Sequence, residues 1–352
     1  MEKDLKNIVV TGGCGFIGSH FVEYVLTQYP EIRVINVDAL TYAAHPDTPG
    51  RLSALGGSRY ELIQKSIGDP SLAKDLESRP VDIIVNFAAE THVDRSILDP
   101  GIFLQTNVMG VQNLLSICRT RSIRLTHVST DEVYGSLEPT DLPFLESSPL
   151  KPNSPYAASK AAADLIVLAS GRTYHQDVVI TRCSNNFGPL QFPEKLLPLL
   201  IANANDGLQI PVYGDGKQIR DWIYVTDHCI AVDSVMRNGT HGEVYNVSAF
   251  GEETNIELIQ KVLKMMGKPT TLIKYVGDRP AHDRRYALDS QKIRQQLGWR
   301  PEVTFENGLL KTVEWYMSNQ LWLNKVRNQD YKKYYAANYD QKFKQPMERV
   351  ST

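Results

Sequence analysis

The sequence predicts an α/β protein whose first half is a doubly wound parallel sheet, followed by a smaller mixed α/β domain. Short β-branched runs alternate with helix-like stretches through the first half, which is the pattern of strands joined by crossover helices. A glycine-rich segment follows the first of these strands. The chain has 352 residues, more than a single core usually supports, so two closely packed domains are expected.

Each predicted element depends on a local pattern. Buried parallel strands are short and rich in Val and Ile, without the alternation of a half-exposed strand. Such runs occupy residues 7–11, 34–38, 81–87, 125–130 and 178–181. Helices are expected between them, including 17–29 and 107–120.

The sequence changes character after about residue 185. Prolines become frequent, and aromatic and charged residues mix with short apolar runs, with prolines at Pro189, Pro193, Pro198 and Pro211. We therefore expect a first domain over 1–185 and a mainly substrate-binding domain over 186–325, with some interleaving. The tail, 326–352, is rich in Lys, Tyr, Asn and Gln, and the sequence does not decide whether it docks through its tyrosines.

Composition excludes several classes of partner. A net charge of -2 gives no electrostatic case for nucleic acid or a membrane surface, so anionic ligands must be held by local clusters of cationic side chains and backbone N–H groups. The cysteines fit neither a zinc pattern nor a disulfide framework, which favours reduced thiols in a cytoplasmic protein; they are Cys14, Cys118, Cys183 and Cys229. We expect no signal peptide, membrane span or bound metal.

The glycine-rich segment predicts a dinucleotide site. Gly12, Gly15 and Gly18 lie between the first strand and the first helix, where glycine allows a sharp turn and a close approach to a pyrophosphate. The helix N-terminus then offers free N–H groups to the phosphates. Tight turns alone can produce the same letters, but the strand before and the helix after favour the cofactor interpretation.

Asp38 favours NAD as the cofactor. It lies at the end of the second strand, 20 residues after Gly18, where a carboxylate can accept hydrogen bonds from ribose hydroxyls. The same charge would repel a 2′-phosphate and disfavour NADP. The alternative is an exposed aspartate at a strand end.

Tyr156 and Lys160 predict an acid–base pair on one face of a helix, because they are four residues apart. A free tyrosine has a pKa near 10, and a neighbouring ammonium and the positive nicotinamide of NAD would lower it. A surface Tyr–Lys pair is the alternative. Here the pair follows a dinucleotide motif at the usual distance, which favours the catalytic interpretation.

Thr130, Asp131 and Glu132 follow a predicted parallel strand, and ligands bind at the carboxyl ends of such strands. Thr130 can bond a substrate hydroxyl. Simple alcohol oxidation needs one base, so two further carboxyls suggest additional proton transfers, such as an elimination. A helix cap or a turn would also explain this acid pair.

These motifs resemble the nucleotide-sugar branch of the extended short-chain dehydrogenases, and within it the dTDP-glucose 4,6-dehydratase family. The likeness runs from about residue 6 to 325. It is carried by 11–18, 87–97, 129–135, 154–160, 182–189, 192–195, 213–222 and 278–286. Thr130-Asp131-Glu132 is the part most typical of dehydratases, since epimerases and decarboxylases usually carry another residue in place of that aspartate.

The resemblance implies a Rossmann fold, a homodimer and a role for each matching position. Thr130, Tyr156 and Lys160 would oxidise the sugar at C4, Asp131 would protonate the departing C6 hydroxyl, and Glu132 would take the C5 proton. Contacts to NAD would come from Gly12, Gly15, Phe16, Ile17, Gly18, Asp38, Ala39, Leu40, Thr41, Ile67, Phe87, Ala88, Ala89, Thr106, Tyr156, Lys160 and Asn186. The nucleotide-diphosphate sugar would be held by Thr91, Thr130, Asn185, Lys195, Leu196, Pro211, Val212, Tyr213, Arg220, Asn255, Asp278, Arg279, Pro280, Ala281 and His282.

The chain departs from the family pattern at four positions. Ser66 stands where an acid is frequent, Phe187 replaces a usual Tyr, Ala281 a usual Gly and Cys14 a usual Ala. None removes a catalytic group, although Ser66 bears on adenine binding and Ala281 on the nucleotide pocket.

Two other functions stay open at the level of sequence. A 4-epimerase or decarboxylase of the same fold would not need two adjacent carboxyls. A non-catalytic NAD sensor or scaffold would need only the cofactor half, which the joint presence of Thr130, Asp131, Glu132, Tyr156 and Lys160 argues against.

Overall fold

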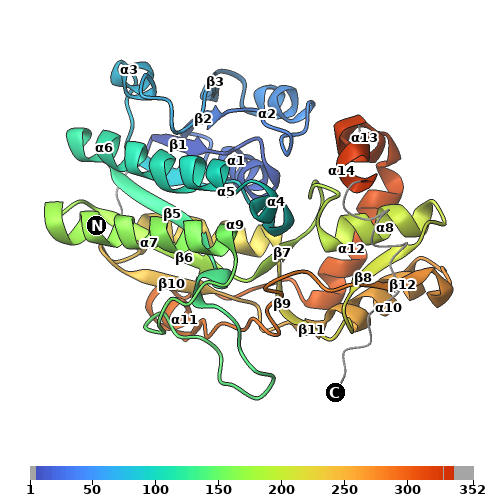
Figure 1. Cartoon of the computed structure of the whole chain (residues 1–352). Coiled ribbons are helices and arrows are strands. Elements are labelled where there is room, and N and C mark those ends of the chain that lie inside the picture. Colours follow the sequence, from blue (N-terminus) through green and yellow to red (C-terminus); the bar gives the residue numbers. More distant parts are fainter. Residues whose placement is uncertain (1–4, 328, 337–352) are drawn as a thin grey trace.

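The computed structural model describes residues 5–327 and 329–336 and is built around one large parallel sheet (Figure 1). Its strand order is β10-β6-β5-β4-β1-β2-β3, and every neighbouring pair is parallel. The strands are β1 Asn7–Thr11, β2 Arg33–Asp38, β3 Tyr60–Gln64, β4 Ile83–Asn86, β5 Arg124–Thr130, β6 Val178–Cys183 and β10 Val244–Val247. The order reverses between β1 and β4, which places a crevice at their carboxyl ends.

Helices cover both faces of this sheet (Figure 1). Apolar residues of α3, α6 and α7 pack in one core cluster, and those of α1, α2 and α9 pack in another. The helices of this part are α1 Phe16–Gln28, α2 Thr48–Gly56, α3 Leu72–Glu77, α4 Val93–Leu98, α5 Pro100–Phe103, α6 Val111–Arg121, α7 Pro155–Tyr174, α9 Val225–Asn238 and α11 Gln291–Leu297. The predicted fold class, a doubly wound Rossmann-type sheet, is confirmed.

A second, smaller unit lies beside the carboxyl edge of the large sheet (Figure 1). It contains two small sheets, β11-β9-β7 and β12-β8, and its own core. Its elements are β7 Asn185–Phe187, α8 Leu196–Asn205, β8 Ile210–Tyr213, β9 Ile219–Tyr224, β11 Glu252–Thr254, α10 Asn255–Met265, β12 Ile273–Val276, α12 Phe305–Ser318, α13 Gln320–Val326 and α14 Gln329–Tyr335. Strand β10 and helix α9 follow residue 185 in sequence and still pack with the large sheet.

The predicted elements match the structure with small differences. The first helix and all five predicted strands begin and end within two residues of their expected bounds, and the strand predicted over 81–87 is the shorter β4. The helical stretch predicted over 107–120 is confirmed and begins three residues earlier. Its first part is a π-helical segment, η2 (Leu104–Gly110), and its α-helical part begins at Val111.

The C-terminal segment docks on the body as far as it is described. The Tyr331 hydroxyl donates to the Pro193 carbonyl at 3.2 Å, and Asn203 donates to the Tyr335 hydroxyl at 2.9 Å. The rings of Trp322 and His45 stack with centroids 4.8 Å apart. The remaining part of the predicted tail, 337–352, lies outside the described residues.

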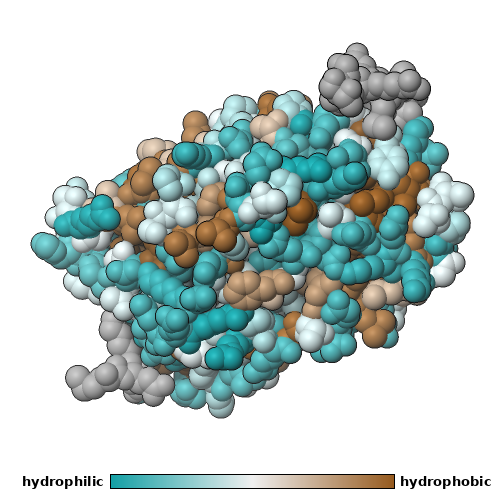
Figure 2. All heavy atoms as spheres, turned by 90° about the horizontal axis from the view of Figure 1, so that it is seen from below, coloured by the Kyte–Doolittle hydropathy of each residue, from teal (hydrophilic) through white to brown (hydrophobic). Residues whose placement is uncertain are grey.

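The surface in Figure 2, seen from below, is mostly hydrophilic, with hydrophobic residues in groups across its middle. Among the described residues, no helix has the length and apolar character that crossing a bilayer requires. All four cysteines are buried and unpaired with one another.

Candidate active site

The glycine-rich turn between β1 and α1 is shaped by close backbone contacts. Gly12 has a φ of +70°, and a side chain there would meet the backbone of Ala88 at 2.6 Å. A side chain on Gly18 would overlap the Gly12 carbonyl, so helix and turn pack directly together. Gly15, in contrast, has only the Gly12 carbonyl oxygen near its open side, at 3.4 Å. Helix α1 begins there without a side-chain cap, which leaves N–H groups available to a pyrophosphate.

Asp38 is fixed at the end of β2 by the same turn. Its two carboxylate oxygens accept hydrogen bonds from the backbone N–H groups of Cys14 and Leu40, each at 2.8 Å. Burial raises the pKa of Asp38, and these two bonds oppose that rise. Each oxygen keeps a lone pair for a ribose hydroxyl, so the residues present fit NAD.

Most other residues assigned to NAD by resemblance lie at the carboxyl edge of the large sheet. Leu40 and Thr41 follow β2, Ile67 follows β3, and Phe87 to Ala89 follow β4. Asn186 is engaged differently. Its Oδ1 lies 2.9 Å from Nδ1 of His228 and its Nδ2 donates to the Ser184 carbonyl at 3.1 Å. Its cofactor role stays a prediction.

Helix α7 carries Tyr156 and Lys160 into the site. Ser154 caps its N-terminus by accepting from the Ala157 N–H at 3.1 Å, and Pro155 occupies the first helical position. Lys160 donates to the Val128 carbonyl at 2.8 Å. Burial lowers the pKa of Lys160 to about 8, although Asp164 raises it.

From the sequence we expected the neighbouring Lys160 to lower the pKa of Tyr156, but the residues around Tyr156 raise it. Burial raises it well above 10, as do the charges of Glu132 and other neighbours, while a hydrogen bond with Thr130 lowers it. The ammonium of Lys160 is held by a carbonyl instead. The sequence suggested two charges that would lower the pKa of Tyr156, the ammonium of Lys160 and the nicotinamide of NAD. Of these two, the charge of a bound nicotinamide remains.

Asp131 and Glu132 lie on a short turn, η3 (Asp131–Tyr134), directly after β5. Thr130 begins this turn, and its hydroxyl donates to Asp131 at 3.1 Å. Burial, and then the charge of Glu132, raise the pKa of Asp131 well above its usual value. Burial also raises the pKa of Glu132, but Arg279, Lys195 and Arg220 oppose that rise. Two adjacent carboxyls are thus held in different electrostatic environments.

A cavity of about 170 Å³ opens beside Glu132, between the large sheet and the smaller unit. Ten of the residues predicted to bind the substrate line it: Asn185, Lys195, Leu196, Pro211, Val212, Tyr213, Arg220, Asn255, Arg279 and His282. Thr91 lies behind this wall, where its carbonyl accepts from Lys195 at 2.8 Å. Pro280 and Ala281 stand outside the lining, and so does Asp278, whose carboxylate contacts His282 at 2.6 Å.

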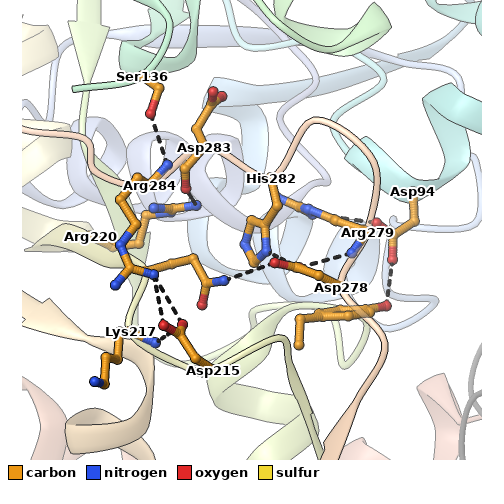
Figure 3. Close-up of polar contacts among 12 residues, drawn as sticks. Asp94, Ser136, Asp215, Lys217, Arg220, Asp278, Arg279, His282, Asp283 and Arg284 are labelled. Atoms are coloured by element: carbon orange, nitrogen blue, oxygen red, sulfur yellow. Dashed lines mark hydrogen bonds and ion pairs between the residues drawn. The ribbon is translucent and has the colours of Figure 1, made fainter. Parts of the chain in front are cut away.

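The cations of the cavity are oriented by a carboxylate in the case of Arg279 and by backbone carbonyls in the cases of Arg220 and Lys195. Arg279 donates to Asp94 at 3.3 Å (Figure 3). The Tyr213 hydroxyl donates to the other oxygen of Asp94 at 3.0 Å. Arg220 donates to the backbone carbonyl of Asp283 at 3.0 Å. Burial and the neighbouring guanidinium groups lower the pKa of His282 to about 4, so its imidazole is neutral at pH 7.

Sequence reasoning missed several lining residues. Asp94 and Glu194 are buried carboxylates, and Glu194 accepts from Tyr42 at 3.1 Å and from Arg95 at 3.0 Å. The missed lining residues are His92, Val93, Asp94, Glu194, Leu199, Trp222, Ile259 and Tyr286. The matched segments 87–97, 192–195, 213–222 and 278–286 contain six of these eight, so a signal for those was present.

Four polar atoms of the residues that line the cavity have no hydrogen-bond partner within the described part of the chain. They are Oδ1 of Asn185, Oδ1 of Asn255, Nε1 of Trp222 and Nε of Arg279. Buried polar groups normally find a partner, so these atoms are suited to a polar ligand.

Two departures from the family pattern have visible structural settings. Ala281 has a φ of +53°, a left-handed conformation that explains why glycine is usual there. Phe187 is buried, and its ring lies edge-on to those of Trp222 and Tyr224. A phenylalanine therefore fits this core position without needing a hydrogen-bond partner.

Fold and site together place the chain among the extended short-chain dehydrogenases. A family described as GDP-mannose 4,6 dehydratase matches residues 9–312, and the chain belongs to it. Within that family, a dTDP-glucose 4,6-dehydratase of Xanthomonas campestris is 48% identical over 92% of this chain and 97% of its own length. One from Escherichia coli is 42% identical over 95% of this chain and 99% of its own.

Solved structures give the same picture. The dTDP-glucose 4,6-dehydratase of Streptomyces venezuelae, with NAD and dTDP bound, has a TM-score of 0.87 at 46% identity and covers 91% of this chain and 99% of its own. The enzyme from Bacillus anthracis in complex with NAD has a TM-score of 0.85 at 45% identity, with the same coverage. A UDP-glucose 4-epimerase of Thermotoga maritima shares the architecture, with a TM-score of 0.82, at only 26% identity over 89% of this chain and 99% of its own.

Proposed function

We propose that this protein is a dTDP-glucose 4,6-dehydratase that uses NAD to form the 4-keto-6-deoxy sugar. The observation that carries the proposal is the Asp131–Glu132 pair beside Thr130 and Tyr156, in which Asp131 is buried and Glu132 is half-buried. Relatives at 41–48% identity over more than nine-tenths of the chain support it. An epimerase or decarboxylase is not favoured, because it would not need two adjacent carboxyls.

The first step needs a base at the sugar C4 hydroxyl. Tyr156 accepts that proton, Thr130 bonds the same hydroxyl, and Lys160 keeps a positive charge nearby. When bound, NAD supplies a hydride acceptor for C4 and later returns the hydride to C6. The resulting C4 ketone acidifies the hydrogen at C5.

Elimination then uses the two carboxyls in different protonation states. Glu132 accepts the C5 proton, and Asp131 protonates the C6 hydroxyl, which leaves as water while the C5–C6 double bond forms. The surroundings suit this division, since three cations favour the ionised form of Glu132 and burial raises the pKa of Asp131, which favours its protonated form. Returning hydride to C6 and a proton to C5 completes the product.

The cavity cations suit a nucleotide diphosphate. Lys195, Arg220 and Arg279 line it together, and a guanidinium binds phosphate oxygens in fixed geometry. Burial lowers the pKa of Lys195, while Glu194 and Glu132 raise it. The negative charge of a bound diphosphate would raise the pKa of Lys195 further and so stabilise its ammonium form.

The decisive assay is turnover with dTDP-glucose, compared with UDP-glucose and GDP-mannose. We expect a product that has lost one water from dTDP-glucose and carries a ketone, detected by mass spectrometry and carbonyl derivatisation. A product of unchanged mass with inverted C4 would identify an epimerase and overturn the proposal. Preference for another base would overturn only the thymidine assignment.

We also propose that the protein is a cytoplasmic homodimer. Buried reduced thiols suit the cytoplasm. Exposed apolar side chains gather on neighbouring elements α4, α5, η2 and α7, namely Leu98, Ile102, Leu104, Met109 and Leu165. A second copy would remove them from water. Light scattering after size exclusion tests the dimer, and a monomer that persists at high concentration would contradict it.

A further inference from the structure

Behind the catalytic residues lies a group of joined polar side chains, here called the Arg182 cluster: Tyr134, Asp164, Arg182 and Asn246. Arg182 Nε donates to Asp164 at 2.8 Å, and its Nη1 donates to the Tyr134 hydroxyl at 2.8 Å. That hydroxyl donates in turn to Oδ1 of Asn246, also at 2.8 Å. All four residues are buried.

The cluster joins the two segments that carry the catalytic groups. Asp164 lies on α7, one turn after Lys160 and two turns after Tyr156, so the three share a helix face. Tyr134 is the last residue of the turn η3 that carries Asp131 and Glu132. Arg182, on β6, lies between these segments and bonds to both.

Stability alone does not explain this arrangement. Burying an ion pair removes two charges from water, and an apolar replacement of similar volume is often as stable. A planar guanidinium, however, donates in fixed directions. Its bonds to Asp164 and Tyr134 therefore set how η3 sits relative to α7, while the backbone bond from Lys151 to Val133 at 3.1 Å holds the turn from its other side.

We propose that Arg182 is a positioning residue that acts through Tyr134 to hold the elimination carboxyls in register with Tyr156 and Lys160. The inference depends on the proposed dehydratase function. It predicts that breaking the link between Arg182 and Tyr134 impairs the steps served by Asp131 and Glu132 more than it impairs C4 oxidation, because Tyr156 and Lys160 remain on an intact helix.

Tyr134→Phe tests this by removing one oxygen from the cluster. Its matched control is Tyr245→Phe, because Tyr245 is equally buried and its hydroxyl also joins two partners, Thr240 N–H at 3.0 Å and Gln296 at 3.1 Å. We expect Tyr134→Phe to lower kcat by about tenfold to 10²-fold, because a 1 Å misplacement of catalytic groups can cost roughly 10²-fold. KM should stay within about twofold, and NADH should accumulate in a single turnover.

The control should keep the wild-type NADH time course, whatever it loses in Tm. Arg182→Lys is a second test, since it retains a positive charge beside Asp164 but loses the fork, and it should show the same NADH accumulation. Equal slowing of oxidation and elimination in both cluster variants, or loss of folded protein in both, would assign the cluster a structural role and overturn the proposal. Absence of any keto-deoxy product from the wild-type protein would instead refute the proposed function.

Discussion

Replacing Glu132 by Gln separates oxidation from elimination. Gln has the size of Glu but cannot accept the C5 proton, while Thr130, Tyr156 and Lys160 remain. A general base contributes about 10²–10⁴ in rate, which corresponds to about 3–5 kcal/mol of barrier at 1.36 kcal/mol per factor of ten. Glu132 stands against three cations that favour its ionised form, so we expect the full loss to fall on the elimination.

The assay is rapid-mixing absorbance of bound NADH, combined with mass spectrometry of sugar recovered from heavy water. Hydride transfer should survive in part, NADH should build up because later steps stall, and exchange of the C5 hydrogen should fall sharply. Asp131→Asn is the matched control, because it should allow C5 exchange while slowing loss of the C6 hydroxyl.

Two results would refute this reasoning. One is complete loss of C4 oxidation in Glu132→Gln while cofactor and substrate still bind. The other is full C5 exchange in the same variant. A double variant, Asp131→Asn with Glu132→Gln, that still formed the keto-deoxy product at the wild-type rate would remove both residues from the mechanism.

Three further predictions concern other residues of the catalytic and cofactor sites. Tyr156→Phe should keep the fold and lose about 10²-fold or more of C4 oxidation in single-turnover absorbance; wild-type turnover would exclude Tyr156 as the base. Asp38→Ala should narrow the preference for NAD over NADP in binding titrations and lower Tm, because the N–H groups of Cys14 and Leu40 lose their acceptor; an unchanged cofactor ratio would contradict the assignment. Asp131→Asn should raise stability at pH 7. Because the pKa of Asp131 is raised in the folded protein, the wild type loses stability as pH rises above the unfolded value of 3.8, at about 1.4 kcal/mol per unit. The gain should vanish below pH 3.8 in thermal scans, and a gain that did not depend on pH would argue against a raised pKa.

The sequence was informative wherever a local pattern decides the structure. The strands 7–11 and 34–38 and the first helix were readable because burial on both faces leaves a run of β-branched residues, and because glycines mark the turn between them. Strands β3 and β10 were not proposed. Strand β3, Tyr60–Gln64, is only half-buried and mixes Glu and Gln with apolar residues, and β10 is four residues long in a region of mixed texture.

The site shows the same division. Motif residues such as Glu132, Lys195 and Arg279 were predicted, and they line one cavity although they are far apart in sequence. Asp94 and Trp222 were not predicted as site residues, because their roles depend on which side chains face them across the cavity. The expectation that Lys160 lowers the pKa of Tyr156 was wrong for a related reason. The spacing on the helix places Lys160 near Tyr156, but only the fold shows that the Lys160 ammonium donates to the Val128 carbonyl.

The adjacent carboxyls illustrate how much the surroundings determine chemistry. Asp131 and Glu132 are neighbours with similar intrinsic acidity, yet the proposed mechanism requires Asp131 to give a proton and Glu132 to take one. The cations that oppose the rise in the Glu132 pKa are led by Arg279, which lies more than a hundred residues later in sequence, whereas the second-largest cause acting on Asp131 is the charge of Glu132 itself. Glu132 therefore helps to assign the role of Asp131. The charge of an ionised Glu132 discourages ionisation of Asp131, so the proposed elimination, which requires one acid and one base at neutral pH, would obtain both from a single turn.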